Sequence, residues 1–276
     1  MILACLLAAL VVVIAGLTLG NYLDPDSESN ASSAAETNQP TEKTEVELSS
    51  EPKAEPEQES EDWDVEVAEE SKAAVGAVTD PTDIRVLVNK LNPLTPASFA
   101  PSDLVSAAGA GVTDTDPSIV LRAEAAEHAA QMSIDAAAAG AGFGVTSGFR
   151  SYETQNQLYS NYSAVDGQAA ADTYSARPSF SEHQTGLAFD AIAPAAGCYD
   201  LGCFGSTPAA GWLAQNSWQY GFILRYPEGS QPVVGYMYEP WHFRYIGVDL
   251  ARDYHESGAA TYEEFLGEPA APNYAN

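Results

Sequence analysis

Two short motifs constrain the fold more than any other feature of this chain, because their side chains form a site only when they meet. The first, Ser-Glu-His-Gln-Thr-Gly-Leu-Ala-Phe-Asp at 181–190, offers His183 and Asp190. The second, Glu-Pro-Trp-His-Phe-Arg-Tyr at 239–245, offers His242 and Glu239. Two imidazoles and a carboxylate can hold a zinc ion and leave one position for water, and a further carboxylate can take a proton from that water. The sequence therefore predicts a hydrolytic metal centre.

The residue periodicity places both motifs on strands. Apolar side chains at 187, 189 and 191 alternate with Asp190 and its neighbours, as in a strand with one buried face. In the second motif the aromatic side chains at 241, 243 and 245 share one side, which leaves His242 on the other. A metal that bridges two such strands is geometrically easy. Glu239 precedes Pro240 in a turn, where it is expected to lie beside the metal without binding it.

Either motif alone has ordinary explanations. A single histidine on a strand is more often a hydrogen-bonded core residue than a ligand. Two histidines and a carboxylate also describe the ligand set of non-haem iron oxygenases, but that chemistry needs a cosubstrate site and gives Glu239 no task. The remaining histidines, His128 and His255, lack a comparable carboxylate arrangement, and we interpret them as structural or surface residues. Hydrolysis uses all four motif residues.

Five segments of the chain resemble the motifs of one known family. They are VNKLNPL at 88–94, SGFRSYETQ at 147–155, SEHQTGLAFD at 181–190, YGFILRYP at 220–227 and EPWHFRY at 239–245. In this order they are similar to the VanY-type D-alanyl-D-alanine carboxypeptidases, zinc peptidases of the bacterial cell wall. The resemblance spans residues 84 to 250.

The resemblance implies a role for each motif residue. His183, Asp190 and His242 would bind one Zn²⁺ per chain, and Glu239 would act as general base and then as general acid. Arg150 would hold the carbonyl or the terminal carboxylate of a peptide. A guanidinium suits this task because it stays charged and can bind a carboxylate through two parallel hydrogen bonds. The residues expected to contact the rest of the substrate are Ser181, Gln155, Tyr159 and Trp241.

The N-terminal part of the chain differs in composition from the rest. Residues 1–20 are almost entirely apolar over the length needed to cross a bilayer core, which predicts a membrane anchor or a signal sequence. Residues 21–82 follow as an acidic linker, in which positions 21–72 carry 17 acidic and 3 basic residues, half of the net charge of −28. Such a segment buries too little apolar surface to offset the entropy of ordering, so we predict disorder. The zinc carboxypeptidase domain is expected at 83–258, with a tail at 259–276.

Helix signals precede most of the strand signals within the domain. Helices are expected from Asp116-Pro117 to Gly140, after Ser151, and from Thr207-Pro208 to Gly221. Strand-like runs at 143–148, 186–192, 222–226, 232–238 and 241–246 cluster in the second half. We therefore predict an α+β fold with a small, mainly antiparallel sheet that carries the zinc site and helices packed on one side, which the resemblance also implies.

The three cysteines divide into two kinds. Cys198 and Cys203 lie in a glycine-containing loop, whereas Cys5 lies in the apolar run. In an exported domain a disulfide between the first two is expected. Free thiols and metal binding are the alternatives, although no third or fourth ligand lies near them in the sequence.

These features predict a zinc carboxypeptidase that removes the terminal D-alanine from peptidoglycan stem peptides, in the cell wall or on the outer face of the cytoplasmic membrane. Cleavage after a D- or an L-residue stays open. The competing functions are a catalytically silent module that binds cell-wall peptides and an endopeptidase that cuts cross-links; Glu239 favours the enzyme. The acidic composition argues against nucleic-acid binding, because phosphate contact needs basic surface. No obligate protein partner is evident.

Overall fold

The protein is described by a computed structural model for residues 76–275. The predicted anchor or signal sequence and most of the acidic linker lie outside these residues. Within 76–275, no helix has both the length and the apolar character needed to span a membrane.

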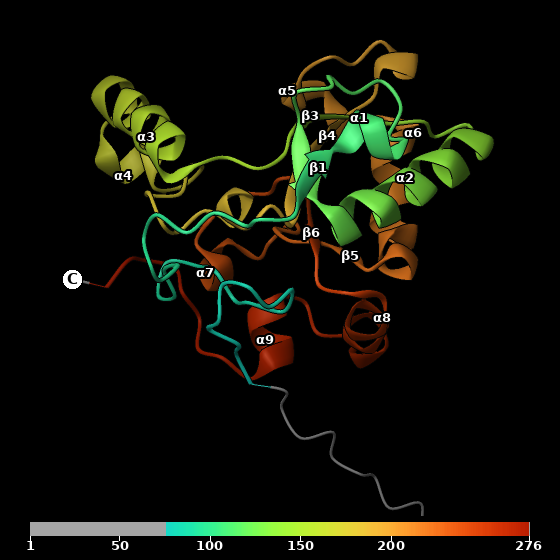
Figure 1. Cartoon of the computed structure of the whole chain (residues 1–276). Helices are drawn as coiled ribbons and strands as arrows, with labels where there is room; N and C mark the ends of the chain where they lie inside the picture. Colours follow the sequence, from blue (N-terminus) through green and yellow to red (C-terminus); the bar gives the residue numbers. More distant parts are fainter. Residues whose placement is uncertain (1–75, 276) are drawn as a thin grey trace, which may run out of the picture. The chain divides into compact units, whose positions relative to one another are not determined.

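A four-stranded antiparallel sheet organises the described residues (Figure 1). Its strands follow the spatial order β3 (Gly144–Ser147), β4 (Ala188–Ile192), β6 (His242–Tyr245) and β5 (Phe222–Leu224). A separate ribbon pairs β1 (Leu104–Ser106) with β2 (Val120–Arg122). The predicted small antiparallel sheet is confirmed, and together with the helices it makes the fold α+β.

Helices of very different length surround this sheet. The longer ones are α2 (Ala123–Ala138), α3 (Tyr152–Asp166), α6 (Pro208–Asn216) and α8 (Val248–Ser257). The shorter ones are α1 (Ala107–Ala110), α4 (Gln168–Ala171), α5 (Leu201–Phe204), α7 (Gln231–Val234) and α9 (Tyr262–Leu266), with 3-10 turns η1 (Glu182–Thr185), η2 (Pro194–Ala196) and η3 (Ser217–Tyr220). The α3 and α6 helices begin where the sequence predicted, because the Ser151 and Thr207 side chains accept hydrogen bonds from backbone N–H groups in the first turn.

One predicted helix has a wrong start, and one predicted strand is wrong. The helix expected from Asp116 starts only at Ala123, because the Asp116 side chain accepts the N–H of Ser118 in a local turn and residues 120–122 then pair with β1. The run 232–238, expected to be a strand, contains the end of α7 instead. Pro232 lies in the first turn of that helix, where its missing N–H is tolerated, whereas a strand ladder would lack that donor.

The sheet has one apolar face and one polar face, as the period-two pattern predicted. The rings of Phe189, Phe222 and Phe243 pack together, with the Phe189 centroid 5.2 Å and 5.7 Å from the other two. They join one core with buried alanines of α2 and with Leu213 of α6. Burial of a side chain of this size stabilises the fold by about 1.5–3 kcal/mol. This packing fixes the sheet and leaves the opposite face for polar groups.

The folded unit extends beyond 83–258 at both ends. The N–H of Ala77 donates to Glu268 Oε1 at 3.1 Å, so the last residues assigned to the linker already contact the domain. The residues assigned to a C-terminal tail form α9, whose Tyr262 and Leu266 are buried in a second apolar cluster with Ile223 and Ile246. The sequence of 259–276 alone does not predict this packing, because the apolar partners Ile223 and Ile246 lie elsewhere in the chain.

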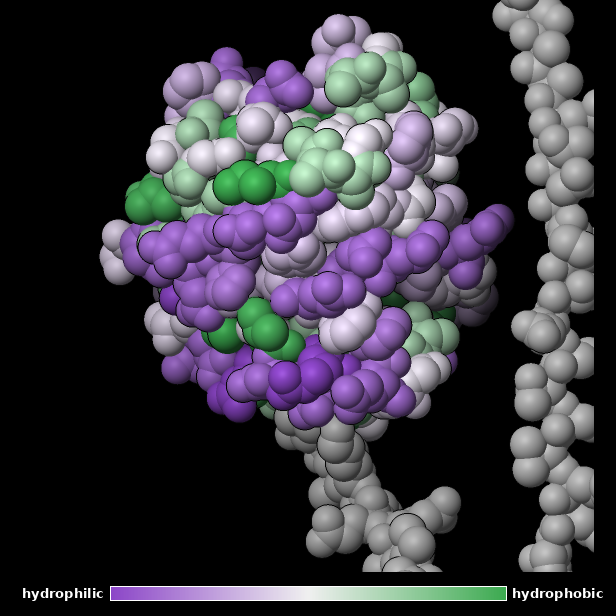
Figure 2. Space-filling view, turned by 90° about the vertical axis from the view of Figure 1, so that its right-hand side faces the viewer, coloured by the Kyte–Doolittle hydropathy of each residue, from purple (hydrophilic) through white to green (hydrophobic). Residues whose placement is uncertain are grey.

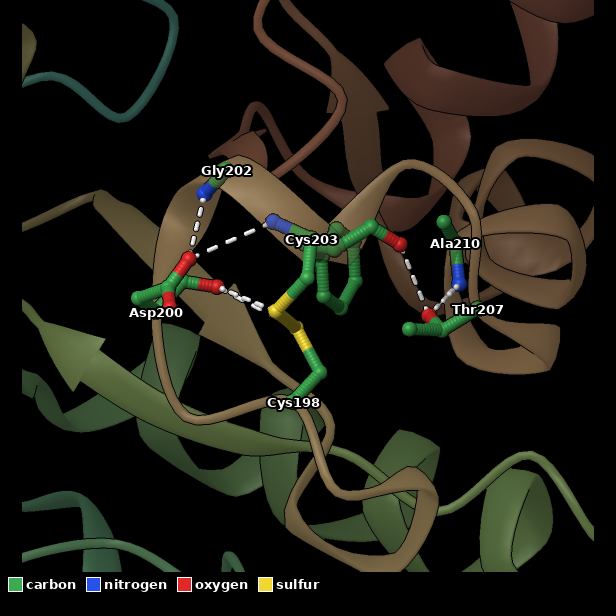
Figure 3. Close-up of a disulfide and its surroundings, with 7 residues drawn as sticks. Cys198, Asp200, Gly202, Cys203, Thr207 and Ala210 are labelled. Atoms are coloured by element: carbon green, nitrogen blue, oxygen red, sulfur yellow. Dashed lines mark hydrogen bonds between the residues drawn. A yellow bond between two sulfur atoms is a disulfide. The ribbon is translucent and has the colours of Figure 1, made fainter.

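The predicted disulfide joins Cys198 and Cys203 (Figure 3). Between them the Asp200 side chain caps α5 by accepting hydrogen bonds from the N–H groups of Gly202 and Cys203, at 2.9 and 3.3 Å. The bridge and the cap together define a compact loop between η2 and α6.

The outer surface shows no dominant apolar region on the face drawn in Figure 2, which is the right-hand side of Figure 1. Hydrophilic side chains cover most of it, and hydrophobic ones form small separate areas. Scattered exposed apolar residues of this kind are normal for a folded domain.

Candidate metal centre and substrate cavity

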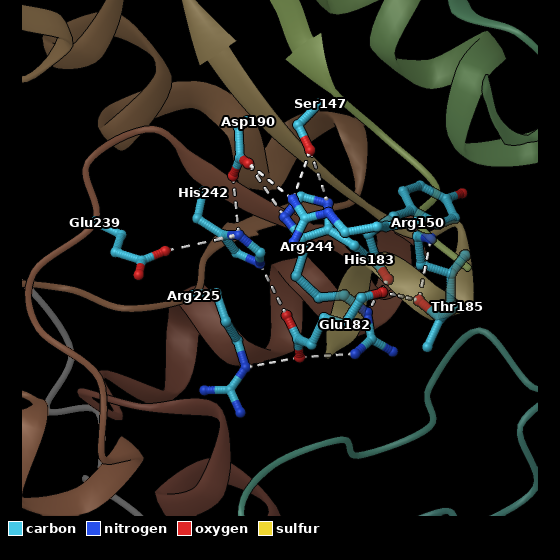
Figure 4. A network of polar contacts seen from close by, with 12 residues as sticks. Ser147, Arg150, Glu182, His183, Thr185, Asp190, Arg225, Glu239, His242 and Arg244 are labelled. Atoms are coloured by element: carbon cyan, nitrogen blue, oxygen red, sulfur yellow. Dashed lines mark hydrogen bonds and ion pairs between the residues drawn. The ribbon is translucent and has the colours of Figure 1, made fainter. Parts of the chain in front are cut away.

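Strand pairing brings the predicted ligands together. Asp190 and His242 lie directly opposite each other on β4 and β6, with Asp190 Oδ1 3.1 Å from His242 Nδ1. His183 lies in η1, and its Nε2 is 3.2 Å from Asp190 Oδ2. This turn ends at Gly186 with a φ of 68°, which favours glycine, and a Cβ there would lie 2.9 Å from a Leu104 methyl carbon. The turn therefore delivers His183 beside the strand that carries Asp190 (Figure 4).

The three side chains fit a metal ion. One ligand atom from each lies within 4.8 Å of the others, and all three residues are buried. The ring nitrogens that face away from this space have acceptors: His183 Nδ1 lies 2.8 Å from the Gly148 carbonyl oxygen, and His242 Nε2 lies 3.2 Å from Glu182 Oε2. Such partners fix the orientation and tautomer of a metal-bound imidazole. Two nitrogens and one carboxylate oxygen suit zinc with one position open.

The charges around the three side chains favour a cation. Burial by itself would raise the pKa of Asp190, but His183 and His242 lower it well below its usual range. Burial lowers the pKa of His242, yet its contacts with Asp190 and Glu182 raise it to about 9. A metal ion binds the unprotonated nitrogen of an imidazole, so metal binding at His242 competes with protonation.

Glu239 lies beside the ligands and is separate from them. Its Oε2 is 3.9 Å from His242 Nδ1, and its backbone N–H donates to Tyr226 O in the turn before Pro240. Burial raises the pKa of Glu239 to about 8, although His242 lowers it. A divalent cation beside it would lower this pKa further. A carboxyl group that titrates near neutrality can accept a proton and return it, which is the task predicted for Glu239.

Arg150 enters the same space from the segment after β3. Its Nη2 lies 3.9 Å from Asp190 Oδ2. Two other side chains fix the guanidinium: Nη1 donates to Gln155 Oε1 at 2.8 Å, and Nη2 donates to Ser147 Oγ at 2.9 Å. The backbone N–H of Arg150 also donates to His183 O. Arg150 is therefore positioned before any substrate binds.

A cavity of about 340 Å³ opens onto these residues. Besides the ligands, Glu182 and Glu239, its wall consists of Arg150, Leu158, Tyr162, Tyr174, Ser175, Ala176, Ser181, Leu201, Tyr226, Tyr236, Met237 and Trp241. Aromatic and apolar walls with a few converging polar groups are typical of small-ligand sites. The cavity suits the end of a peptide, with Arg150 as the cation that faces it.

The residues expected to contact the substrate divide in two. Ser181 and Trp241 line the cavity. Gln155 is buried behind Arg150, and its Nε2 donates to Ala176 O at 2.6 Å. Tyr159 does not line the cavity, because its hydroxyl donates to Asp172 Oδ1 at 2.7 Å. Tyr162, on the same helix, lines it instead.

Sequence reasoning missed a group of buried charges behind His242. Glu182, Arg225, Arg244 and Glu263 are each at most 1% exposed. A signal for two of them was present, because Arg225 and Arg244 interrupt apolar strand-like runs at 222–226 and 241–246. A charged residue in such a run is rarely buried without a partner. The identity of the partners could not be found from the same runs.

Comparison with known proteins gives one family. The model of the VanY family, described as D-alanyl-D-alanine carboxypeptidase, matches residues 118–248. One relative is YodJ of Bacillus subtilis strain 168, which is named as a candidate carboxypeptidase. Its sequence is 32% identical to that of this chain over 271 residues, and the match covers 96% of this chain and 94% of YodJ.

Two solved structures share the fold. The LdcB LD-carboxypeptidase is 35% identical in sequence to this chain. Its structure matches with a TM-score of 0.61, and the match covers 68% of this chain and 88% of LdcB. A mutant of the D,D-pentapeptidase VanY from the VanB-type resistance cassette, in complex with Zn(II), is 29% identical, with a TM-score of 0.54 over 66% of this chain and 97% of that one.

Proposed function

The chain belongs to the VanY-type family of D-alanyl-D-alanine carboxypeptidases, and we propose that it uses zinc to remove the terminal D-alanine from peptidoglycan stem peptides. It is a peptidase by this membership. The observation that carries the proposal is the convergence of His183, Asp190 and His242, with Glu239 3.9 Å from the last of them. The Zn(II) complex of the related VanY supports zinc as the metal, and we propose one ion per chain.

The residues of the cavity can divide the work of hydrolysis. When bound, zinc would act as a Lewis acid and lower the pKa of a water molecule. Glu239 takes a proton from the attacking water and returns it to the leaving amine. Arg150, held by Gln155 and Ser147, binds the carbonyl oxygen or the terminal carboxylate of the peptide.

Two stem peptides are the candidate substrates. The likeness to LdcB, described as an LD-carboxypeptidase, supports cleavage of a tetrapeptide that ends in one D-alanine. The likeness to the D,D-pentapeptidase VanY supports cleavage of a pentapeptide that ends in two.

The test is mass spectrometry of both defined peptides after incubation with the zinc-loaded protein. Loss of one D-alanine, abolished by a chelator and restored by zinc, is expected for at least one of them. Peptide binding without any release would indicate the silent binding module. Release of cross-linked fragments from intact sacculi, without D-alanine, would indicate the endopeptidase. Either result would overturn the carboxypeptidase proposal.

We also propose that the enzyme works outside the cytoplasmic membrane, either tethered through residues 1–20 or secreted. The apolar character of 1–20, the location of stem peptides in the cell wall and the Cys198–Cys203 disulfide support this. Protease treatment of intact cells that produce the protein should degrade a tethered form. A form protected until the cells are lysed would contradict the proposed location.

A further inference from the structure

A buried carboxylate contacts His242 on the side away from the metal site. Glu182 Oε2 lies 3.2 Å from His242 Nε2, while His242 Nδ1 faces Asp190 and Glu239. The Glu182 side chain is 0% exposed. Glu182 lies in η1 directly before His183, and Figure 4 shows its carboxylate between His242 and the guanidinium groups of Arg225 and Arg244.

Two arginines hold this carboxylate in place. The other oxygen, Glu182 Oε1, accepts hydrogen bonds from Arg225 Nε at 2.9 Å and from Arg244 Nη1 at 2.8 Å. Arg244 is itself fixed by backbone carbonyls, since its Nη2 donates to Ile84 O and Val86 O. Both guanidinium groups contact Oε1, which leaves Oε2 of Glu182 free for His242.

The second carboxylate of the network comes from the C-terminal helix α9. Arg225 Nη1 and Nη2 donate to Glu263 Oε2 and Oε1 at 3.0 and 2.6 Å. Asn89 Nδ2 also donates to Glu263 Oε1, at 3.0 Å. Two carboxylates and two guanidinium groups balance in charge, and among these four side chains only that of Glu182 hydrogen-bonds to the side chain of a metal-site residue.

The two histidines of the site have different supports. The ring nitrogen of His183 that faces away from the metal site meets a neutral carbonyl, that of Gly148. The corresponding nitrogen of His242 meets an anion whose position is fixed by two cations. A carboxylate that accepts the N–H of a metal-bound imidazole increases the basicity of the imidazole and fixes its rotation. His242 therefore depends on its support more than His183 does.

We propose that Glu182 is a positioning residue of the metal site, which directs His242 Nδ1 toward the metal and strengthens its binding. This inference rests on the proposed zinc site. Loss of an outer-shell partner of this kind lowers metal affinity by about 10–100-fold.

The chain offers a matched pair of variants for the test. Glu182→Gln and Glu263→Gln each remove one negative charge from the same buried network and keep the size of the side chain. Zinc affinity, measured by competition with a chromophoric chelator, should fall about 10–100-fold in Glu182→Gln and stay at the wild-type value in Glu263→Gln. The visible spectrum of bound Co²⁺ should change only in Glu182→Gln. Circular dichroism checks that both variants are folded.

Equal losses of affinity in the two variants would show general destabilisation and refute the positioning role, and unchanged affinity in both would also refute it. If Glu182→Gln does not fold, Glu182→Asp keeps the charge but withdraws the carboxylate from His242. It should bind zinc more weakly than Glu263→Gln does, and equal affinities would refute the inference. Failure of the wild-type protein to bind zinc would refute the zinc site itself, which is a separate outcome.

Discussion

The strand pair β4 and β6 and the C-terminal segment 259–275 serve the same site in different ways. The strands carry Asp190 and His242, which point into the site from motifs with fixed spacing. The C-terminal segment has no recognisable motif and contributes no ligand, but its Glu263 pairs with Arg225 behind His242. Chemistry requires particular atoms at particular distances, whereas support requires only a group of the right charge from any element that can reach it.

The same segment supports the cavity wall at a second place. The ring of Tyr274 lies under the Arg177 guanidinium at 4.0 Å, and its hydroxyl is 3.1 Å from that of Tyr236, which lines the cavity. The buried Lys90 donates to Gly235 O and Pro272 O and so ties the segment to this wall. The comparison therefore predicts two kinds of defect: loss of chemistry from the strand motifs and loss of stability from the C-terminal segment.

The largest effect is expected in the second motif. Glu239→Gln keeps the size of the side chain but cannot accept a proton, so turnover should fall by about 10²–10⁴-fold while zinc stays bound. His242→Ala should lose both zinc and activity, because one of three ligands is gone. Zinc content by elemental analysis and D-alanine release separate the two. Loss of zinc from Glu239→Gln would make Glu239 a ligand, and near-normal turnover would refute its role as base.

Removal of the C-terminal segment should affect stability first. A chain that ends at Gly258 loses α9 with the buried Tyr262 and Leu266, and Arg225 keeps only Glu182 as its ionic partner. Breaking a buried ion pair in this way costs about 3–5 kcal/mol. A chain that ends at Gly267 keeps Glu263 and loses Tyr274, so it should be less destabilised. Denaturant unfolding gives the free energies of unfolding. Equal free energies of unfolding for the full chain and the two truncated chains would contradict the supporting role of the segment.

The disulfide is expected to have a smaller effect of the same kind. Replacement of Cys198 and Cys203 by serine opens a short loop, for which chain entropy predicts a loss of about 2 kcal/mol. Leu201, inside this loop, lines the cavity, so the Michaelis constant should rise while turnover changes little. A large fall in turnover with an unchanged free energy of unfolding would place the loop with the catalytic motifs instead.

The smallest effect concerns the two tyrosines of α3. Tyr159→Phe removes one hydrogen bond to Asp172 outside the cavity, which should cost about 0.5–1.5 kcal/mol of stability and leave the Michaelis constant unchanged. Tyr162→Ala, by contrast, removes part of the cavity wall and should raise it. Peptide titrations of D-alanine release measure both. If Tyr159→Phe raises the constant as much as Tyr162→Ala does, Tyr159 contacts the substrate after all.

Secondary structure shows the limits of local pattern in the same molecule. The caps Ser151 and Thr207 and the alternation at 187–192 were sufficient to predict α3, α6 and β4. The helix expected from Asp116 starts only at Ala123, because residues 120–122 pair with β1. The strand expected at 232–238 is wrong for a local reason, since Pro232 lies in the first turn of α7. Only the first of these two differences depends on tertiary pairing.

The sequence by itself predicted the ligands and the base from residue types at spacings that two strands can satisfy, and it predicted the role of Arg150 from the family resemblance of segment 147–155. Only the tertiary structure decided which charges support them. Glu182, Arg225 and Glu263 come from three separate segments, and nothing in a local period records that they meet in one buried network. The choice between Tyr159 and Tyr162 was decided in the same way, since the orientation of α3 depends on its contacts with distant residues. The chemistry of a motif can be predicted from residues that are close in sequence, whereas burial depends on how the whole chain packs.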